Sequence, residues 1–240
     1  MAKQFNRTEL LLGKENMEKL KKAHVLIFGI GGVGGYVVEA LARSGIYHFT
    51  LVDNDVISET NINRQIIATL DNIGEDKVEV MKKRILSINK EAEVKIRKCF
   101  YLPDTASEFD FSKYDYVVDC VDTVSAKLSI IIEAKKNNVP IISAMGAGNK
   151  LNPAMLEVAD ISKTSVDPLA KVIRTELRKR GINHLKVVYS KEQPIKIDDP
   201  NVELKEKSQR PVPGSNAFVP STMGLIMASE IIKDLIFNLF

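Results

Sequence analysis

A cluster of glycines between a predicted strand and a predicted helix is the first group of residues that could do chemistry. It reads Gly29-x-Gly31-Gly32-x-Gly34 and follows the apolar run His24–Phe28. Glycines in this place allow a tight turn and let the backbone approach phosphate oxygens. The N-terminus of the next helix then offers free N–H groups and a partial positive charge. In this context the cluster predicts a nucleotide-binding loop.

Charged residues after the glycine cluster separate a dinucleotide from a triphosphate. Asp53 ends the next predicted strand, 19 positions after Gly34, where an acidic residue would bind ribose hydroxyls of either ligand. The glycine loop alone can hold most of a dinucleotide pyrophosphate. A second acid at Asp55, a guanidinium at Arg64 and an ammonium at Lys77 suit a triphosphate with a metal ion better. These residues favour ATP.

A further carboxylate, Asp122, falls just after the fourth predicted strand, in the segment Asp119-Cys-Val-Asp122. Ligands of open α/β sheets bind at the carboxyl ends of the strands, so Asp122 is a candidate Mg²⁺ ligand. Each of these charged residues alone would be interpreted as a solvated surface charge. Their shared position at strand ends and loop exits favours one site.

The elements that must position these residues follow from the hydrophobic pattern. Apolar runs of strand length alternate with helical patterns, which is typical of βαβ units. We expect strands at 24–28, 49–52, 93–97, 116–119 and 140–143, and helical segments at 37–42, 78–88 and 124–137. The fold class is therefore α/β, with a Rossmann-like, mostly parallel sheet and helices on both faces.

The pattern changes after Gly148. We expect short strands at 155–158 and 187–189, a basic helix at about 168–180, a long surface loop at 191–215 and a C-terminal amphipathic helix. The short strands would form a small antiparallel addition to the sheet. We therefore interpret residues 1–240 as one domain, with a nucleotide-binding core at 1–148 and a substrate-facing extension at 149–240.

Composition excludes several classes of protein. With 45% hydrophobic residues, 13 glycines and 2 cysteines, the chain does not resemble a disordered, collagen-like or disulfide-rich protein. No secretory signal is evident, and charges interrupt the apolar C-terminal segment at helical spacing, so we expect no membrane span. So few cysteines in a chain of 240 residues indicate a reducing, cytoplasmic location.

The net charge of +3 is unevenly distributed along the chain. Residues 171–191 hold seven Lys and Arg against Glu176 alone, a local charge of +6, which leaves −3 for the remainder. Such a segment could hold a phosphate backbone, although a solvated helix face gives the same pattern. The candidates for binding nucleic acid on the expected helix are Lys171, Arg174, Arg178, Lys179 and Arg180.

Several segments resemble a known family. GIGGVGG, VDNDVISETNINRQ, GEDKVEVMKKRI and DCVDTVSAK are similar to the adenylating domain shared by ThiF, MoeB and ubiquitin-activating E1 enzymes. GAGNKLNPAMLEVADISKTSVDPLAKVIRTELRKRGI and GSNAFVPSTMGLIMASEIIKDL resemble the tRNA threonylcarbamoyladenosine dehydratase family more specifically. The resemblance covers nearly the whole chain. It implies an ATP-dependent ring closure on tRNA, in which a carboxylate is activated as an acyl-adenylate and then attacked intramolecularly, with net loss of water.

The resemblance also implies roles for individual residues. Gly29, Gly31, Gly32 and Gly34 would line the phosphates and Asp53 the ribose. The residues that would orient and neutralise the triphosphate are Asn61, Arg64, Gln65 and Lys77. Asp122 would hold Mg²⁺, and a monovalent cation, Na⁺ or K⁺, near residues 146–152 is a further candidate. Arg7 matches a family arginine that reaches the ATP of a partner subunit, which implies a homodimer.

Two other functions are compatible with parts of the sequence. The alternative within the superfamily is adenylation of a ubiquitin-like sulfur-carrier protein. Relatives of that kind carry a cysteine after the fifth strand and CxxC zinc sites, whereas residues 121–240 hold no cysteine. Cys99 and Cys120 lie in apolar settings typical of core packing, which disfavours persulfide or thioester transfer. Some relatives in the resembled family carry a cysteine in the segment that reads Val187-Val-Tyr-Ser-Lys here, and its absence makes a sulfur-relay partner doubtful. A nicotinamide-dependent oxidoreductase would leave Arg64, Lys77 and Asp122 unexplained.

Overall fold

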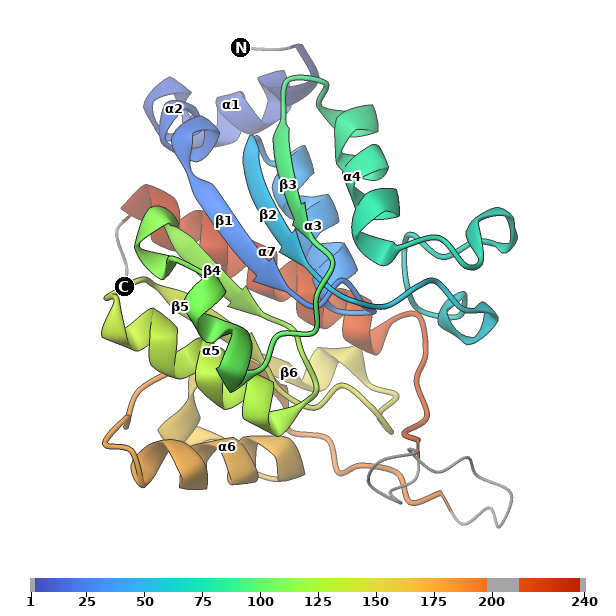
Figure 1. Ribbon diagram of the computed structural model, residues 1–240, viewed down its shortest axis with the longest axis vertical. Helices are drawn as coiled ribbons and strands as arrows, with labels where there is room; N and C mark the ends of the chain where they lie inside the picture. Colours follow the sequence, from blue (N-terminus) through green and yellow to red (C-terminus); the bar gives the residue numbers. More distant parts are fainter. Residues whose placement is uncertain (1–2, 198–211, 238–240) are drawn as a thin grey trace.

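The computed structural model describes residues 3–197 and 212–237, and a single sheet runs through it (Figure 1). The strand order is β3-β2-β1-β4-β5-β7-β6, and only β6 runs antiparallel to its neighbour. The strands are β1 His24–Phe28, β2 His48–Val52, β3 Glu93–Arg97, β4 Tyr116–Asp119, β5 Ile141–Ala144, β6 Leu156–Asp160 and β7 Lys186–Ser190. This arrangement confirms the predicted fold class, including the antiparallel addition.

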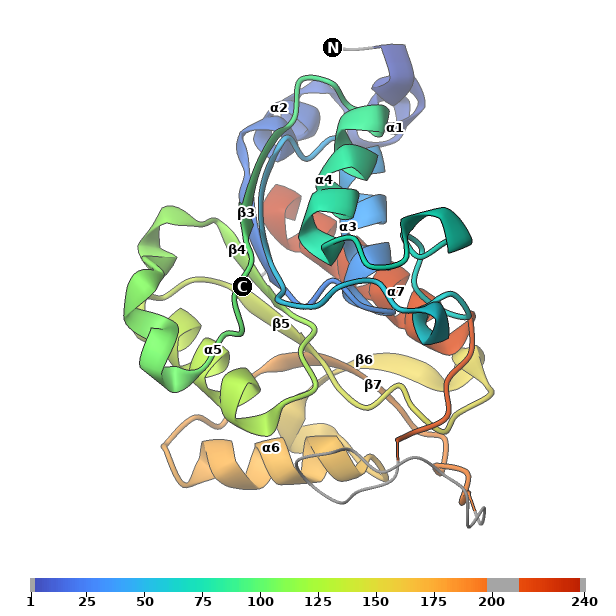
Figure 2. The same cartoon turned by 45° about the vertical axis from the view of Figure 1, so that its right-hand side comes forward.

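Helices cover both faces of the sheet (Figure 2). They are α1 Asn6–Leu12, α2 Lys14–Lys22, α3 Gly34–Arg43, α4 Lys77–Ile88, α5 Val124–Lys136, α6 Pro168–Arg178 and α7 Val219–Phe237. One apolar cluster joins α3, α4 and α7 to one face, and a second joins α5 and α6 to the other. Alternate residues of β1 serve the two clusters, with Val25 in the first and Leu26 in the second. A strand buried on both faces has the continuous apolar sequence that β1 shows.

The main difference from the prediction lies near the N-terminus, and the bounds of β2, β5, β6 and β7 shift by one or two residues. Helices α1 and α2 were not predicted, because α2 buries only Met17 and Leu20, too few positions for a clear helical period. Strand β6 begins at Leu156 rather than Met155, which ends a short 3-10 turn. Most of the loop predicted at 191–215 lies outside the described residues. No helix in the described ranges has the length and apolar character that crossing a bilayer needs.

Strand register brings the chemical residues to one edge. Phe28, the last residue of β1, pairs with Val52 of β2 and with Asp119 of β4. The residues that follow these three therefore leave the sheet side by side at its carboxyl edge. The chain turns in opposite directions from β1, toward β2 on one side and β4 on the other, which makes this edge the expected ligand crevice.

Helix α7 packs directly on the glycine loop and the start of α3. A Cβ at Gly224 would lie 2.4 Å from the carbonyl oxygen of Val33 and 2.9 Å from the Cβ of Tyr36. Neither neighbour is the flexible end of a side chain, so only glycine permits this approach. The C-terminal helix thereby supports the nucleotide-binding loop from behind.

Replacing Gly224 by alanine should separate α7 from the glycine loop. We expect Gly224→Ala to lower the free energy of unfolding by about 1–3 kcal/mol through overpacking, measured by urea denaturation. Leu225→Ala is the matched control, because this neighbouring side chain is 48% exposed, and it should stay within about 0.5 kcal/mol of the parent protein. Equal stability of the two variants would contradict the close contact.

Candidate functional site

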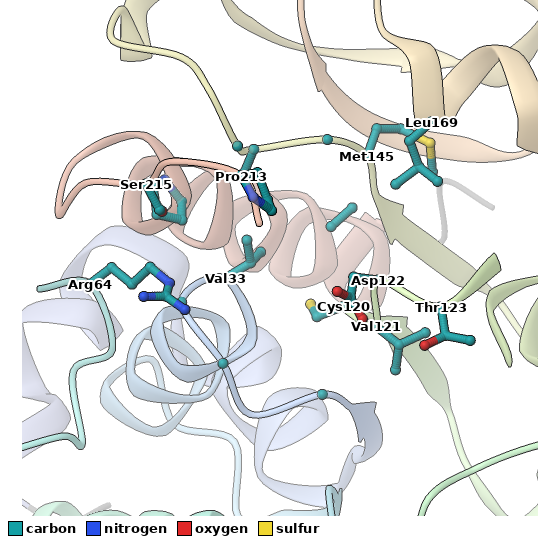
Figure 3. A pocket seen from close by; sticks show the side chains of 18 of the residues that line it. Val33, Arg64, Cys120, Val121, Asp122, Thr123, Met145, Leu169, Pro213 and Ser215 are labelled. Carbon is teal, nitrogen blue, oxygen red and sulfur yellow. The ribbon is translucent and has the colours of Figure 1, made fainter. Parts of the chain in front are cut away.

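A cavity of about 710 Å³ opens at the carboxyl edge of the sheet (Figure 3). Its wall is formed by the loops after β1 to β5, by the first turn of α6, and by residues 212–215. This volume lies in the range of small-molecule sites. Most of the predicted site residues line this cavity. Gly34 lies directly behind its wall, and Arg7 and the predicted cations of α6 lie outside it.

The glycine loop presents unused hydrogen-bond donors to the cavity. A Cβ at Gly34 would lie 1.8 Å from the carbonyl oxygen of Gly29, so this turn is closed to any other residue. Within the described ranges, the N–H groups of Gly31, Gly32 and Val33 donate to no protein acceptor. Orphaned N–H groups before a helix form a site for an anion such as phosphate.

Asp53 joins the end of β2 to the glycine loop. Its carboxylate accepts the N–H of Ile30 at 2.6 Å and the N–H of Asp55 at 2.9 Å. Burial raises the pKa of Asp53 above its ordinary value, and the Lys77 ammonium and the two N–H donors offset part of this rise. The carboxylate is thus held rigidly where the sequence predicted a ribose ligand.

Two cations face the same part of the cavity. Lys77, the first residue of α4, is buried and donates to the carboxylate of Asp55 at 2.7 Å. Arg64 donates to the carbonyl of Thr60 and the side-chain oxygen of Asn63, and within the described residues it makes no ion pair. The Arg64 stem lies 3.3 Å from where a Cβ of Gly32 would be. Its charge is therefore available to an anion on the glycine loop.

The two predicted amides differ in what they do. The side-chain oxygen of Asn61 accepts the N–H of Ser58 at 3.2 Å, so this amide shapes the turn that carries Arg64. Gln65 is buried, and its side-chain oxygen has no hydrogen-bond partner among the described residues. The Gln65 amide nitrogen lies 3.8 Å from where a Cβ of Gly31 would be. An orphaned buried amide beside the glycine loop indicates a place for a ligand or water.

Asp122 lies on the cavity wall in the turn between β4 and α5 (Figure 3), two residues after Cys120, which contacts the glycine loop at Gly29. A buried ion pair that the sequence analysis missed lies under this turn. Lys127 donates to Asp119 at 2.7 Å, to the hydroxyl of Ser143 and to the carbonyl of Ala144. Neither charged side chain is exposed. The pair joins the exits of β4 and β5, and so holds the turn that carries Asp122.

A second buried ion pair, also missed, fixes the loop after β5. Lys150 donates to Asp167 at 2.8 Å and to the carbonyl of Gly146 at 2.6 Å. The Asp167 carboxylate also accepts the N–H groups of Gly146 and Ala170, which makes it the N-cap of α6. The cation that the structure places in the segment 146–152 is thus the Lys150 ammonium. The described residues contain no cluster of three or more His, Cys, Asp or Glu able to hold a metal ion.

Both cysteines line the cavity, whereas the sequence predicted that they pack in the core. Cys120 follows β4 directly and lies behind Gly34, while Cys99 lies just beyond β3. Burial raises the pKa of both thiols above the ordinary value. A protonated thiol is a poor nucleophile, so neither cysteine is prepared for thioester or persulfide chemistry.

The basic segment at 171–191 does not form one continuous basic face. Arg174 donates to Thr164, and Lys179 and Arg180 both pair with Glu176. Lys186 pairs with Asp234, and Lys191 pairs with Glu157. Of the five candidates on α6, Lys171 and Arg178 are the exposed cations whose side chains make no ion pair within the described ranges. Carboxylates distant in sequence thus pair with two of the seven cations, Lys186 and Lys191, and Glu176, already counted in the +6, holds two more.

Arg7 lies away from the cavity of its own chain. It is exposed on α1, at the end of the sheet where β1 begins (Figure 1). No element of the chain carries it toward the glycine loop. Its predicted contact with the ATP of a partner subunit stays a prediction.

Comparison with known proteins adds an independent line of argument. A model of the ThiF family matches residues 3–237. A tRNA threonylcarbamoyladenosine dehydratase of Bacillus subtilis (strain 168) is 46% identical, over 98% of this chain and 96% of that protein. Crystal structures of E. coli tRNA N6-threonylcarbamoyladenosine dehydratase, TcdA, with AMP and with ATP each give a TM-score of 0.88 at 33% identity. Each of these two alignments covers 98% of this chain and 94% of the TcdA chain.

The buried pair of Lys150 and Asp167 makes a specific prediction about stability. Lys150→Met should lower the free energy of unfolding by about 3–5 kcal/mol, because it leaves a buried carboxylate without its counter-ion. Adding Asp167→Asn removes that charge while its side-chain oxygen can still cap α6, so the double variant should recover part of the loss. Guanidinium denaturation of the parent protein and both variants measures this. A double variant less stable than Lys150→Met would contradict the assigned ion pair.

Proposed function

The chain belongs to the ThiF family, and from this premise we propose that it dehydrates threonylcarbamoyladenosine in tRNA, using ATP and an acyl-adenylate intermediate. The observation that carries the proposal is the layout of the cavity. One half holds the N–H groups of Gly31–Val33, which donate to no acceptor among the described residues, beside Arg64, which makes no ion pair among them. The other half, formed by the loops after β4 and β5, is open for a second substrate. The similarity to dehydratases over 98% of the chain supports the same reaction.

The first step transfers AMP to the substrate carboxylate. A carboxylate oxygen attacks the α-phosphorus of ATP, the bond to the β-phosphate oxygen breaks, and pyrophosphate leaves. Negative charge then builds on the departing phosphates, where the glycine-loop N–H groups, Arg64 and Lys77 can stabilise it. Asp53 would hold the ribose in the place predicted for it.

The second step closes a ring within the substrate. The ureido group of the same modification attacks the acyl carbon, AMP leaves with the electron pair of the carbon–oxygen bond, and one proton is released. The sum over both steps is the loss of one water at the expense of ATP. Because nucleophile and electrophile belong to one molecule, the protein needs mainly to position them.

The residues fit a magnesium ion bound with the triphosphate. Mg²⁺ in such sites takes one or two carboxylates together with phosphate oxygens, and Asp122 supplies a carboxylate on the cavity wall. Bound there, the ion would neutralise phosphate charge. The predicted Na⁺ or K⁺ near residues 146–152 stays a prediction.

A homodimer would account for α1. Leu10 and Leu11 are 88% and 82% exposed, more than any other large apolar side chain of the described residues. Adjacent apolar side chains this exposed favour a protein–protein contact. Arg7 is on the same helix, and in a homodimer it could reach the cavity of the partner subunit.

The tRNA substrate also supports a cytoplasmic location.

Adenylation of a sulfur-carrier protein is the weaker alternative. Relatives that adenylate such a carrier and then relay sulfur use a reactive cysteine. In this chain burial raises the pKa of both thiols, so neither is a good nucleophile. Direct ring closure requires no thiol. A sulfur-relay partner therefore stays doubtful.

The proposed reaction can be tested directly by mass. Incubation with ATP, Mg²⁺ and threonylcarbamoylated tRNA should release AMP and pyrophosphate, and the modified nucleoside should lose the mass of one water. The tRNA without the modification is the control and should release no AMP. Adenylation of a carrier protein with no change in tRNA mass would overturn the proposal.

Two lysines on one helix provide a matched test of the ATP site. Lys77→Ala should lower kcat at least about 100-fold, because it removes a charge that stabilises the departing phosphates. Lys83→Ala, on the same helix α4, removes an exposed lysine that pairs with Glu75 outside the cavity, and it should leave turnover unchanged. Steady-state release of AMP measures both. Equal turnover of the two variants would contradict the site.

The tRNA contact is tested at the unpaired cations of α6. We expect Lys171→Ala/Arg178→Ala to weaken tRNA binding and to reduce the slope of log Kd against log salt by about 1.5–2, since two phosphate contacts are lost. Lys14→Ala/Lys90→Ala removes two exposed charges elsewhere and is the control. Filter binding from 50 to 300 mM KCl, about the range in which such contacts are screened, gives both slopes. An unchanged slope in the α6 variant would place tRNA on another surface.

A further inference from the structure

We infer that Met145 and Leu169 form the subsite for the amino-acid side chain of the modified nucleoside, where the methyl group of threonine would pack. The inference rests on the proposed function and deepens it. It assigns substrate specificity to two residues that carry no charge for the phosphates of ATP. The ligand class is a carbamoyl amino acid with a small aliphatic side chain.

The two residues contribute apolar side chains to the cavity wall on the side of β5 and α6. Met145 directly follows β5, and Leu169 lies in the first turn of α6. Both belong to the same apolar cluster, and Figure 3 draws their side chains together, across the cavity from the turn Cys120–Thr123. A triphosphate needs charged partners and gains nothing from such a wall. The wall is therefore available to the second substrate.

The wall formed by Met145 and Leu169 lies at a distance from the glycine loop that the acyl group of the substrate can span. In the sheet, β4 alone separates β1 from β5. At about 4.8 Å per strand, the exit of β5 lies about 10 Å from the exit of β1, where the phosphates would bind. The carboxylate that attacks the α-phosphorus is bonded directly to the carbon that carries the amino-acid side chain. That side chain therefore lies near the phosphates, and Met145 and Leu169, at the end of β5, offer it an apolar wall on that side.

One carboxylate holds both residues in place. Asp167 accepts the N–H of Gly146, which follows Met145, at 3.1 Å, and the N–H of Ala170, which follows Leu169, at 2.9 Å. The Lys150 ammonium neutralises this buried carboxylate at 2.8 Å. Both segments of the subsite are thus fixed before any ligand arrives. A rigid apolar wall discriminates between side chains by size, one methyl group at a time.

The test compares two forms of the same tRNA, one carrying threonylcarbamoyladenosine and one carrying glycylcarbamoyladenosine. They compete in one reaction, and nucleoside masses give the ratio of their kcat/KM values. We expect the parent protein to prefer the threonyl form. Leu169→Ala should reduce that preference about fourfold or more, the effect of one buried methyl group. Leu169→Phe, which fills the subsite, should also reduce it, by excluding the threonyl form.

Controls separate specificity from folding. Leu225→Ala removes an exposed leucine on α7 outside the cavity and should keep the parent ratio. ATP affinity and thermal unfolding of each variant show whether the fold is intact, and Leu169→Val replaces any variant that fails to fold. Unchanged ratios in the folded Leu169→Ala and Leu169→Phe variants would overturn the subsite. A parent protein that acts on neither tRNA would overturn the proposed function and the subsite with it.

Discussion

The turn from Gly29 to Gly34 is the constraint on which the rest of the site depends. A Cβ at Gly34 would lie 1.8 Å from the carbonyl oxygen of Gly29, so the strand and the helix meet as closely as the backbone allows. That closeness places the start of α3 at the end of β1 and leaves three N–H groups without acceptors in the described ranges. Arg64 approaches the same loop from one side, and α7 supports it from behind at Gly224.

The opposite wall is built from buried charge. Lys127 with Asp119 and Lys150 with Asp167 lie beneath the turns after β4 and β5, and all four side chains are at most 1% exposed. Removing such charges from water is costly, so these pairs contribute little net stability. Their value is geometric, because each ammonium joins two segments that are distant in sequence. The glycine loop thus presents phosphate donors, and the buried pairs hold the wall that faces them.

Much of the fold follows from local pattern. Strands β1, β3 and β4 have the predicted bounds, because each is a short apolar or alternating run with clear breaks on both sides. Helices α1 and α2 escaped prediction, since their few buried residues do not repeat at a helical period. The site residues at Asp53, Arg64, Lys77 and Asp122 were predictable because each follows a strand or opens a helix, and parallel strands end at one edge.

Other features depend on ion pairs and hydrogen bonds between residues distant in sequence, which no local pattern predicts. The seven basic residues at 171–191 suggested one basic face, but Asp234, Glu157 and Thr164 occupy three of them in the folded chain. Lys150 and Asp167 are 17 positions apart, and nothing in either segment indicates that they meet. By itself the sequence determined the order of the elements, the phosphate-binding turn and the ATP-directed residues, because their spacing is local. Only the tertiary structure decided which charges are neutralised and which wall faces the phosphates, since these contacts form between strands and helices brought together by folding.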